Sequence, residues 1–587
     1  MMDNESLRTF ARQRALAWTK SPYDEDTQAR VSKLLAEDGE QLVESFYTEL
    51  EFGTGGLRGL MGDGTNRMNR YTVGQATEGL ARYILQADPD SPSVAIAHDS
   101  RNGSPEFAQV AAEVLAANGI EVHLFAELRP TPQLSFTVRH LGCTAGIVIT
   151  ASHNPKEYNG YKVYWNDGGQ IVPPHDAAII SEVRAVAGPD DVKWGNTASR
   201  QRIFRLDAAA DQPYINSILN LRLDESLISE GSDINIVYTP LHGTGAVSVI
   251  PALHAAGFRQ VHIVDSQRVP DGNFPTVHSP NPEEGAALSE AIDLAKEVGA
   301  QLVLGTDPDS DRVGIAVPDD TQSSGWRLLN GNETGALLVN YVVTGRKKAG
   351  QLNPSFDFIA KTIVTTDLMA EIGRSEGMVV HETLTGFKWI AAIIREQQGK
   401  GRFVVGGEES YGYMIGDSVR DKDAVAACTM ICEMAHVAAQ SGKTLLDQLR
   451  EIHEQHGAFK EALVSQTKHG REGKQAIVDQ MESLRTQPPK EIGGEIITEL
   501  RDYRSQSTRH LLTSETHPIA LPSSNVIQIV TADQSIVTAR PSGTEPKIKF
   551  YFSVRMPRDQ WDSFGGYRGA MLELEARIER LKKAMGV

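Results

Sequence analysis

The stretch AGIVITASHNP, residues 145–155, holds a predicted buried strand and the turn that ends it. Residues 145–149 are all small or apolar, which is typical of a strand buried on both faces of a sheet. Pro155 has no backbone N–H and prevents the chain from continuing as a strand or a helix. Ser152 is therefore expected in a tight turn at the end of a buried strand, where α/β sheets bind ligands. Taken alone, an Asn-Pro turn with a surface serine explains the same residues.

Short apolar strands alternate with amphipathic helices on both sides of this stretch. Helices are expected over 27–50, 105–118, 248–256 and 286–298, and strands at 94–97, 121–125, 234–238, 262–264, 301–304, 358–364, 378–381 and 403–405. This alternation predicts α/β layers. Strands at 526–530, 535–538 and 547–554, followed by a helix over 561–583, instead predict a smaller α+β domain. A length of 587 residues predicts about four domains, which we place at 1–210, 211–325, 326–455 and 456–587.

The composition is that of a folded acidic protein. There are 58 Lys and Arg against 76 Asp and Glu, a formal net charge of −18, which argues against a general nucleic-acid binder. A few local cations can still hold a small anionic substrate. The three cysteines are too few for a disulfide framework or a zinc site, and Cys428 and Cys432 are expected as buried thiols on one helix face.

The sequence gives no sign of a membrane protein. Residues 1–12 lack the apolar core of a signal peptide, and no apolar run is long enough for a transmembrane helix. We therefore expect a cytoplasmic protein without a membrane partner.

The sequence GTDPDSDR, residues 305–312, follows a predicted strand and carries Asp307, Asp309 and Asp311. Three carboxylates at alternate positions repel one another unless a cation gathers them, and Mg²⁺ is the first choice for such oxygen ligands. An EF-hand is excluded because its sixth position is Arg312 and its twelfth is Pro318. A solvated acidic turn is the alternative.

Two further loops carry polar groups after predicted strands. TARPSGTEPK, residues 538–547, offers a guanidinium, hydroxyls, a glycine and a lysine, which suit a phosphate cradle, although a polar hairpin turn is the alternative. It is not a Walker A loop. In GGEESYGY, residues 406–413, adjacent carboxylates suit sugar hydroxyls, and an exposed acidic loop is equally compatible. Taken alone, RDKD at 420–423 predicts a solvated charged turn. The loop TLTGFK at 383–388 is uninformative by itself.

The joint content of these loops is more specific than any one of them. A hydroxyl nucleophile, a carboxylate cluster, a hydroxyl-binding acidic loop and a phosphate cradle together indicate phosphoryl transfer on a polyhydroxylated substrate.

The loops resemble the motifs of the α-D-phosphohexomutase family, the phosphoglucomutases and phosphomannomutases, over nearly the whole chain. The resemblance rests on TASHNP at 150–155, GTDPDSDR at 305–312, GEES at 407–410 and RPSGTEP at 540–546, supported by FGTGGLRG at 52–59, YTPLHGTG at 238–245 and PDGNFPTVHSPNPEE at 270–284. The sequences of residues 52–59 and 384–390 are similar to those of a branch of longer family members that includes bacterial phosphoglucomutases. The resemblance implies three related mixed-sheet α/β domains and a C-terminal α+β domain around a central cleft.

The resemblance also implies roles for individual residues. Ser152 would carry the phosphoryl group, and Asp307, Asp309 and Asp311 would bind Mg²⁺ together with an oxygen on Ser152. Polar residues near the transferring phosphate would be Arg58, His153, Lys162, Arg312 and Lys422. The sugar would be bound by Glu408 and Ser410 with the preference loop of Thr385, Gly386 and Lys388, and its other phosphate by Arg540, Ser542, Gly543 and Thr544.

One departure concerns the general base. Some bacterial family members carry a histidine shortly after the GES-like loop, whereas residues 410–413 here are SYGY. Lys422 or Lys162 is then the expected acid/base.

The function implied is interconversion of glucose 1-phosphate and glucose 6-phosphate through a phosphoserine and glucose 1,6-bisphosphate. A phosphomannomutase, a phosphopentomutase, a serine-dependent metallophosphatase and a non-catalytic sugar-phosphate sensor are the alternatives. The expected partners are sugar phosphates, with monomer or dimer left open.

Overall fold

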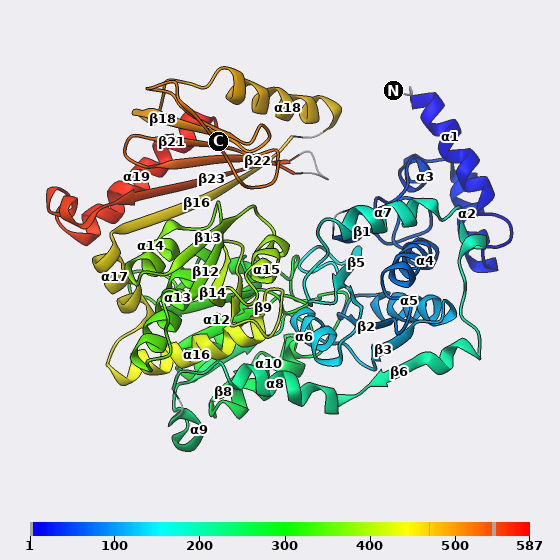
Figure 1. Cartoon of the computed structure of the whole chain (residues 1–587), viewed down its shortest axis with the longest axis horizontal. Coiled ribbons are helices and arrows are strands. Elements are labelled where there is room, and N and C mark those ends of the chain that lie inside the picture. Colours follow the sequence, from blue (N-terminus) through cyan, green and yellow to red (C-terminus); the bar gives the residue numbers. More distant parts are fainter. Residues whose placement is uncertain (1–3, 54, 225, 469, 543–546) are drawn as a thin grey trace. The chain divides into compact units, whose positions relative to one another are not determined.

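A computed structural model describes residues 4–53, 55–224, 226–468, 470–542 and 547–587. Figure 1 shows the whole chain. It divides into two compact units. Unit 1 contains residues 1–329, 391–398 and 412–437, and unit 2 contains 330–390, 399–411 and 438–587. Each unit is therefore built from segments that are distant in sequence.

Three helices open unit 1: α1 (Asn4–Ala17), α2 (Glu25–Glu37) and α3 (Glu40–Phe46). Helix α2 begins after Asp24, whose carboxylate accepts the backbone N–H of Thr27 and caps the helix. The three helices bury Trp18, Val31 and Phe46 in a small core of their own.

The first sheet of unit 1 has the strand order β1-β5-β4-β2-β3-β6. Its strands are β1 (Gly56–Leu60), β2 (Ser93–His98), β3 (Glu121–Phe125), β4 (Ala145–Ile149), β5 (Tyr158–Trp165) and β6 (Ile203–Leu206). Strands β4, β2, β3 and β6 are parallel, β5 is antiparallel to β4, and β1 is antiparallel to β5. Helices α4 (Arg70–Ala87), α5 (Ser104–Ala117), α6 (Thr131–Leu141) and α7 (His175–Ala185) complete this layer. The sheet is mixed, as expected.

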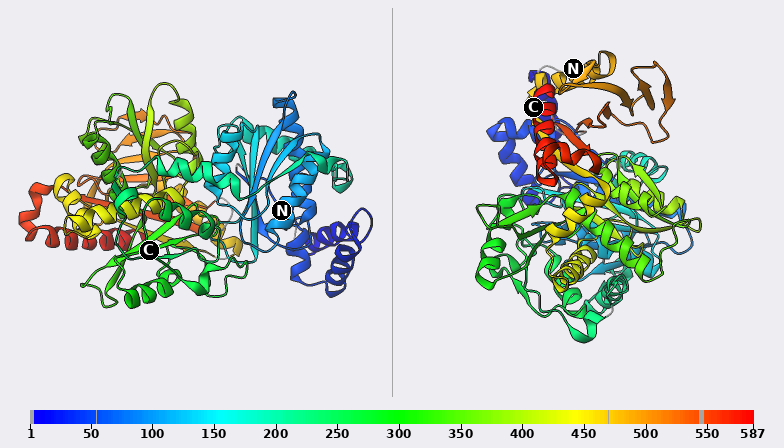
Figure 2. Two further views of the ribbon diagram at one scale, coloured as in Figure 1. Left: turned by 90° about the horizontal axis from the view of Figure 1, so that it is seen from below. Right: turned by 90° about the vertical axis from the view of Figure 1, so that its left-hand side faces the viewer.

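Helices lie on both sides of this sheet (Figure 2). Alternate residues of its central strands pack against different helices. Ile147 and Ile149 pack in the core with α4 and α5, whereas Val148 packs in the core with Leu134 and Val138 of α6. This period of two is the strand geometry itself, and it explains why β4 is apolar at every position. The buried strand predicted at 145–149 is confirmed.

The second sheet of unit 1 has the order β11-β10-β9-β7-β8. Its strands are β7 (Ile236–Thr239), β8 (Val261–Ile263), β9 (Leu302–Thr306), β10 (Val313–Pro318) and β11 (Trp326–Leu329). The helices are α8 (Asp211–Leu219), α9 (Ser226–Glu230), α10 (Gly245–Ala255), α11 (Asp265–Arg268) and α12 (Ser289–Val298). Strands β9 and β10 are antiparallel neighbours joined by residues 307–312, so both ends of the acidic loop are fixed by one sheet.

Unit 2 contains a parallel layer and an antiparallel layer. The parallel strands are β13 (Val379–Thr383), β12 (Asp357–Thr362) and β14 (Arg402–Glu408), accompanied by α13 (Gly331–Lys348) and α14 (Asp367–Ser375). Helix α15 (Phe387–Glu396) begins in unit 2, and its residues from 391 on are part of unit 1. Strand β15 (Gly412–Ile415) and most of α16 (Ala424–Gln440) also belong to unit 1.

The antiparallel sheet has the order β16-β23-β22-β21-β18-β19-β20, with β17 paired to β18. Its strands are β16 (Ala458–Thr467), β17 (Glu491–Ile492), β18 (Glu495–Asp502), β19 (Ser507–His510), β20 (Thr516–Pro518), β21 (Ile527–Thr531), β22 (Ile536–Pro541) and β23 (Lys547–Met556). Helices α17 (Leu445–His456), α18 (Gly470–Thr486) and α19 (Tyr567–Met585) accompany it. Phe550 and Phe552 of β23 pack in one core with Leu574 and Ile578 of α19. A smaller α+β region at the C-terminus is thus present, although five of its strands and α18 were not predicted.

Two predicted helices are shorter than expected. The helix at 286–298 begins as a 3₁₀ turn (Gly285–Leu288) before α12, and the closing helix is preceded by a 3₁₀ segment (Arg558–Phe564) that ends at Gly565 in the left-handed region. Other 3₁₀ turns lie at Pro189–Asp191, Ser199–Arg202 and Ala208–Ala210. The domain boundaries placed at 210, 325 and 455 stay a prediction.

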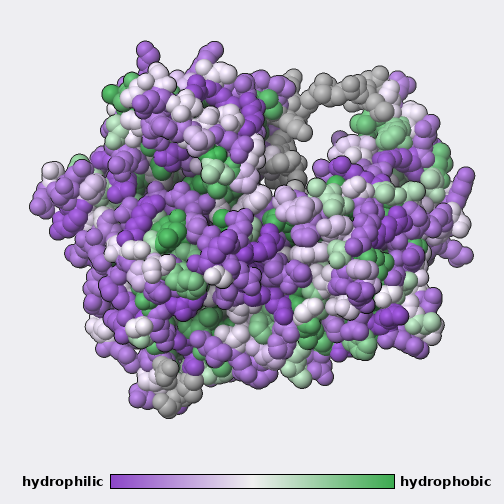
Figure 3. All heavy atoms as spheres, in the orientation of Figure 1, coloured by the Kyte–Doolittle hydropathy of each residue, from purple (hydrophilic) through white to green (hydrophobic). Residues whose placement is uncertain are grey.

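Hydrophilic residues cover most of the face shown in Figure 3, and hydrophobic residues are scattered in small groups. Cys428 and Cys432 are buried on α16, as predicted. Among the described residues, no helix has the length and apolar character needed to span a membrane.

Candidate functional site

Ser152 lies two residues beyond the end of β4, in a turn with a left-handed backbone (φ 52°). Its N–H donates to Thr150 Oγ1 at 2.8 Å, and its own hydroxyl donates to Asp307 Oδ2 at 2.6 Å. His153 Nδ1 lies 3.2 Å from the same hydroxyl oxygen. The hydroxyl thus belongs to a buried polar cluster, and the alternative of an exposed serine in a surface turn is wrong.

The three aspartates are fully buried and close together. One carboxylate oxygen from each of Asp307, Asp309 and Asp311 lies within 4.8 Å of the others. Asp307 Oδ1 accepts the backbone N–H groups of Asp311 and Arg312, which closes the loop on itself. The alternative of a solvated acidic turn is therefore excluded.

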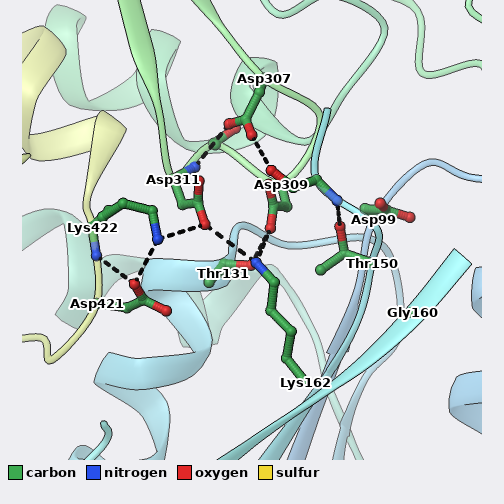
Figure 4. Close-up of polar contacts among 12 residues, drawn as sticks. Asp99, Thr131, Thr150, Gly160, Lys162, Asp307, Asp309, Asp311, Asp421 and Lys422 are labelled. Atoms are coloured by element: carbon green, nitrogen blue, oxygen red, sulfur yellow. Dashed lines mark hydrogen bonds and ion pairs between the residues drawn. The ribbon is translucent and has the colours of Figure 1, made fainter. Parts of the chain in front are cut away.

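Two lysines gather these carboxylates (Figure 4). Lys162, on β5, places Nζ 2.7 Å from Asp309 Oδ2 and 3.2 Å from Asp311 Oδ2. Lys422, in the loop before α16, lies 3.1 Å from Asp311 Oδ2. Opposite charges at this distance offset the repulsion among the aspartates, so residues separated by more than a hundred positions form one ionic cluster.

The environment shifts the pKa values of these groups in different directions. Burial, followed by the charges of Asp309 and Asp311, holds the pKa of Asp307 well above its usual range. Burial alone would raise the pKa of Asp309, but the Lys162 ammonium lowers it overall. Burial alone would lower the pKa of Lys162, and the two aspartates beside it raise it instead.

The donor set fits a hard cation. Asp309 Oδ1 and Asp311 Oδ1 are buried and have no hydrogen-bond partner among the described residues. Buried acceptors without partners are costly unless an ion or water satisfies them. Carboxylate and hydroxyl oxygens are the ligands that Mg²⁺ prefers, so these residues fit the magnesium site that the sequence indicated.

The segment 420–423 is buried, which corrects the solvated turn predicted from RDKD alone. Asp421 Oδ1 accepts both the Nζ and the backbone N–H of Lys422, at 2.9 and 2.8 Å. Tyr164 donates its hydroxyl to Asp421 Oδ2 at 2.7 Å. Asp421 and Lys422 are therefore paired with each other and with groups of the surrounding fold. Four charged residues in a row do not reveal such partners.

Close packing beneath the acidic loop holds it in place. Thr131, the first residue of α6, donates its hydroxyl to Asp309 Oδ2 at 2.9 Å and its N–H to the Asp309 carbonyl. A Cβ at Gly243 would lie 2.4 Å from the Cα of Pro308, so this position requires glycine. Thr131, Asp421 and Tyr164 were not predicted from the sequence. Thr131 could have been found as a hydroxyl residue at the start of a helix that follows a predicted strand. Asp421 could have been found because it is next to Lys422, which was predicted.

The remaining predicted residues of unit 1 lie around Ser152. Arg58, exposed on β1, contacts Asn154 Oδ1 at 3.4 Å. Arg312 pairs with Glu283 at 2.5 Å. Burial, followed by the charges of Arg312 and Arg58, holds the pKa of His153 well below its usual range. Unit 1 therefore brings together Ser152, the aspartates and the cations predicted near the transferring phosphate.

Unit 2 contains the predicted sugar-binding residues. Glu408 ends β14, is buried, and accepts the backbone N–H of Gly386 at 2.8 Å, which joins the two predicted sugar loops. Thr385, Ser410 and Lys388 are half-buried, and Lys388 Nζ lies 5.3 Å from the ring centroid of Trp389. The alternative of an exposed acidic loop is excluded, since Glu408 is buried.

Glu409, next to Glu408, accepts hydrogen bonds from residues at and just beyond the end of β12. Thr362 and Thr365 donate their hydroxyls to Glu409 Oε2 at 3.3 and 3.2 Å. Burial, followed by the charge of Glu408, raises the pKa of Glu409 to about 7.

The predicted phosphate loop connects β22 to β23 in unit 2. Arg540 and Ser542 are half-buried, and Ser542 donates its N–H to the Lys547 carbonyl at 2.7 Å. The buried hydroxyl of Tyr551 lies beside Arg540, whose charge lowers the pKa of Tyr551 while burial raises it overall. Gly543 and Thr544 lie outside the described residues.

Comparisons with known proteins agree with this architecture. Three models of phosphoglucomutase/phosphomannomutase α/β/α domains match: domain I at 49–188, domain II at 212–321 and domain III at 330–455. A phosphoglucomutase of Staphylococcus haemolyticus (strain JCSC1435) is 38% identical over 515 residues, covering 87% of this chain and 92% of that protein.

Solved structures share the fold. Parafusin, a phosphoglucomutase from Paramecium, has a TM-score of 0.65 at 17% identity, covering 92% of this chain and 96% of its own. A phosphoglucomutase/phosphomannomutase family protein from Burkholderia thailandensis has a TM-score of 0.63 at 18% identity, covering 92% and 98%. Together, these matches and the antiparallel C-terminal sheet show three α/β domains followed by an α+β region. This chain belongs to the α-D-phosphohexomutase family, the phosphoglucomutases and phosphomannomutases.

Proposed function

We propose that the protein is a phosphoglucomutase, an intramolecular phosphotransferase that interconverts glucose 1-phosphate and glucose 6-phosphate through a phosphoserine at Ser152. The observation that carries this function is the hydrogen bond from the Ser152 hydroxyl to the buried aspartate cluster that Lys162 and Lys422 neutralise. The phosphoglucomutase relatives at 38% identity support glucose as the sugar. The cytoplasmic location expected from the sequence stays a prediction.

The chemistry assigns each group a task. In the phosphorylated enzyme, the bond from Ser152 Oγ to phosphorus breaks while the C6 hydroxyl oxygen of glucose 1-phosphate forms the new bond, giving glucose 1,6-bisphosphate. The second transfer returns the C1 phosphoryl group to Ser152 and releases glucose 6-phosphate. Asp307, Asp309 and Asp311 would hold Mg²⁺, which when bound neutralises charge on the transferring group.

The protein's own cations support the same step. Lys162 and Lys422 place ammonium groups beside the cluster, where fixed charges stabilise a transferring phosphoryl group. Lys162 or Lys422 is the proposed acid/base, as expected from the sequence. An ammonium group can only donate a proton, so either lysine must first lose its own proton before it accepts that of the hydroxyl. Arg540 and the hydroxyl of Ser542 are proposed to bind the phosphate that is not being transferred, and Glu408 the sugar hydroxyls.

The experiment is a coupled glucose 6-phosphate assay on the wild type and on Ser152→Ala, run with labelled glucose 1,6-bisphosphate. We expect turnover to fall by at least about 10³-fold, as for other removed nucleophiles, and label to remain on the wild type only. Ser266→Ala, at an exposed serine outside the site, is the control and should keep wild-type turnover. Label retained on Ser152→Ala would place the nucleophile elsewhere, and free phosphate as the main product of the wild type would indicate a phosphatase.

A further inference from the structure

A buried arginine that is absent from the predicted site holds the backbone of the serine loop. Arg101 follows β2, in the sequence HDSR at 98–101, and its side chain has no solvent exposure. Its Nη1 donates to the carbonyls of Pro155 and Tyr158 at 2.9 and 3.1 Å. Its Nη2 donates to the carbonyls of Ser152, at 2.5 Å, and Asn154. One guanidinium thus binds four carbonyls within seven residues.

Arg101 is itself fixed from two sides. Its Nε faces Asp99 Oδ2 at 3.3 Å, and Asp99 Oδ1 accepts the Arg101 N–H and the Ser104 hydroxyl, at 2.9 and 2.7 Å. The guanidinium carbon also lies 5.1 Å from the ring centroid of Phe274. Because burying a cation is costly without such partners, the position is built to hold a guanidinium.

The loop needs this support because Ser152 has a positive φ. A non-glycine residue in the left-handed region is strained and persists only when its surroundings fix it. The Thr150 hydroxyl fixes the N–H of Ser152, and Arg101 fixes its carbonyl. Both ends of the strained residue are therefore held, and the hydroxyl is directed to Asp307.

We infer that Arg101 is a positioning residue for phosphoryl transfer, which holds the loop 152–158 so that Ser152 Oγ is aimed at the aspartate cluster. It acts through the backbone, because its hydrogen bonds go to carbonyls and none goes to the Ser152 hydroxyl. Its effect on the rate rests on the proposed function, whereas its effect on the loop does not.

The test compares the wild type with Arg101→Lys, which keeps the charge and loses the planar fork that reaches four carbonyls. Hydrogen–deuterium exchange should be at least about 10-fold faster in 152–158, with exchange in α5 and β2 unchanged, because only local anchors are lost. Single-turnover transfer from phosphorylated enzyme to glucose 1-phosphate, normalised to labelled Ser152, should slow by about 10²-fold with KM within about 3-fold, as for a misplaced reacting group.

Arg485→Lys is the matched control. Arg485 is also buried, in unit 2, and bonds Asp502 and Asn525. This variant should lose stability without changing loop exchange or the rate per labelled serine.

Several outcomes would overturn the inference. Wild-type exchange in the loop of Arg101→Lys, or exchange that rises equally throughout unit 1, would reduce Arg101 to a structural role. If Arg101→Lys fails to fold, Asp99→Asn takes its place, since it keeps Arg101 and removes the charge facing Nε; wild-type loop exchange in that variant overturns the inference. A wild type that transfers no phosphoryl group would refute the proposed function and leave the exchange result to decide the role of Arg101.

Discussion

Lys162 competes with any cation that binds the aspartate cluster, so its removal is expected to tighten metal binding while slowing catalysis. Its Nζ lies 2.7 and 3.2 Å from oxygens of Asp309 and Asp311. Lys162→Met keeps an unbranched side chain one atom shorter, deletes the charge and leaves the site one unit more negative. The two carboxylates also lose a donor, and Asp309 Oδ2 keeps the Thr131 hydroxyl as a hydrogen-bond donor.

The magnitude follows from the charges. Two unit charges about 4 Å apart interact by about 4 kcal/mol at an effective dielectric of 20. Relaxation of Lys422 and entry of water offset much of this, and we expect the Kd for Mg²⁺ to fall about 10- to 100-fold, or about 1.4–2.8 kcal/mol. Turnover should fall by at least about 10²-fold, because a fixed charge near the transferring group is lost.

The assay is isothermal titration of the chelator-treated protein with MgCl₂, beside the coupled assay at saturating Mg²⁺. Lys361→Met is the control, because Lys361 is a buried lysine that pairs with two carboxylates, Asp367 and Glu382, in unit 2. It should leave the Kd within about 2-fold, because Lys361 pairs with other carboxylates and shares no partner with the aspartate cluster among the described residues. An unchanged or weaker Mg²⁺ affinity in Lys162→Met would refute the electrostatic argument.

Three other changes test separate parts of the site. Asp309→Asn should raise the Mg²⁺ concentration needed for half-maximal activity, since one anionic ligand becomes neutral. Chelation of the metal should abolish the activity of the wild type, and full activity in excess chelator would exclude the metal. Arg540→Ala should weaken binding of glucose 1-phosphate by about 2–3 kcal/mol, the value of a charge-assisted contact, and should release more glucose 1,6-bisphosphate in a product assay; unchanged binding would refute the role of that loop. The pKa of Glu409 is raised to about 7 in the folded protein, so the folded state binds the proton of this carboxyl more tightly than the unfolded state does. The protonated carboxyl therefore adds to the free energy of unfolding; this contribution is fully present below the unfolded pKa and is lost as the pH rises through about 7. Glu409→Gln should therefore flatten the decline of urea stability between about pH 5 and pH 8, and an unaltered profile would place the titration elsewhere.

The sequence alone determined the character of the elements and the residue types of the site. A run of small and apolar residues ended by Pro155 is enough to predict a buried strand followed by a turn, because strand burial and the missing N–H are local properties. The alternate aspartates at 307–311 likewise predict a cation, because their mutual repulsion depends only on their spacing. The antiparallel strands β16 to β20 were missed because their exposed faces give weak apolar patterns.

Only the tertiary structure decided which charges meet. The segment 420–423 reads as an exposed turn, yet Lys422 is buried between Asp311 and Asp421, since the fold supplies partners from other elements. Lys162 reaches the aspartates through the pairing of β5 with β4, and Arg101 reaches four loop carbonyls from the end of β2. A buried charge is tolerated only where partners surround it, and those partners are distant in sequence, so their identity is a property of the folded chain.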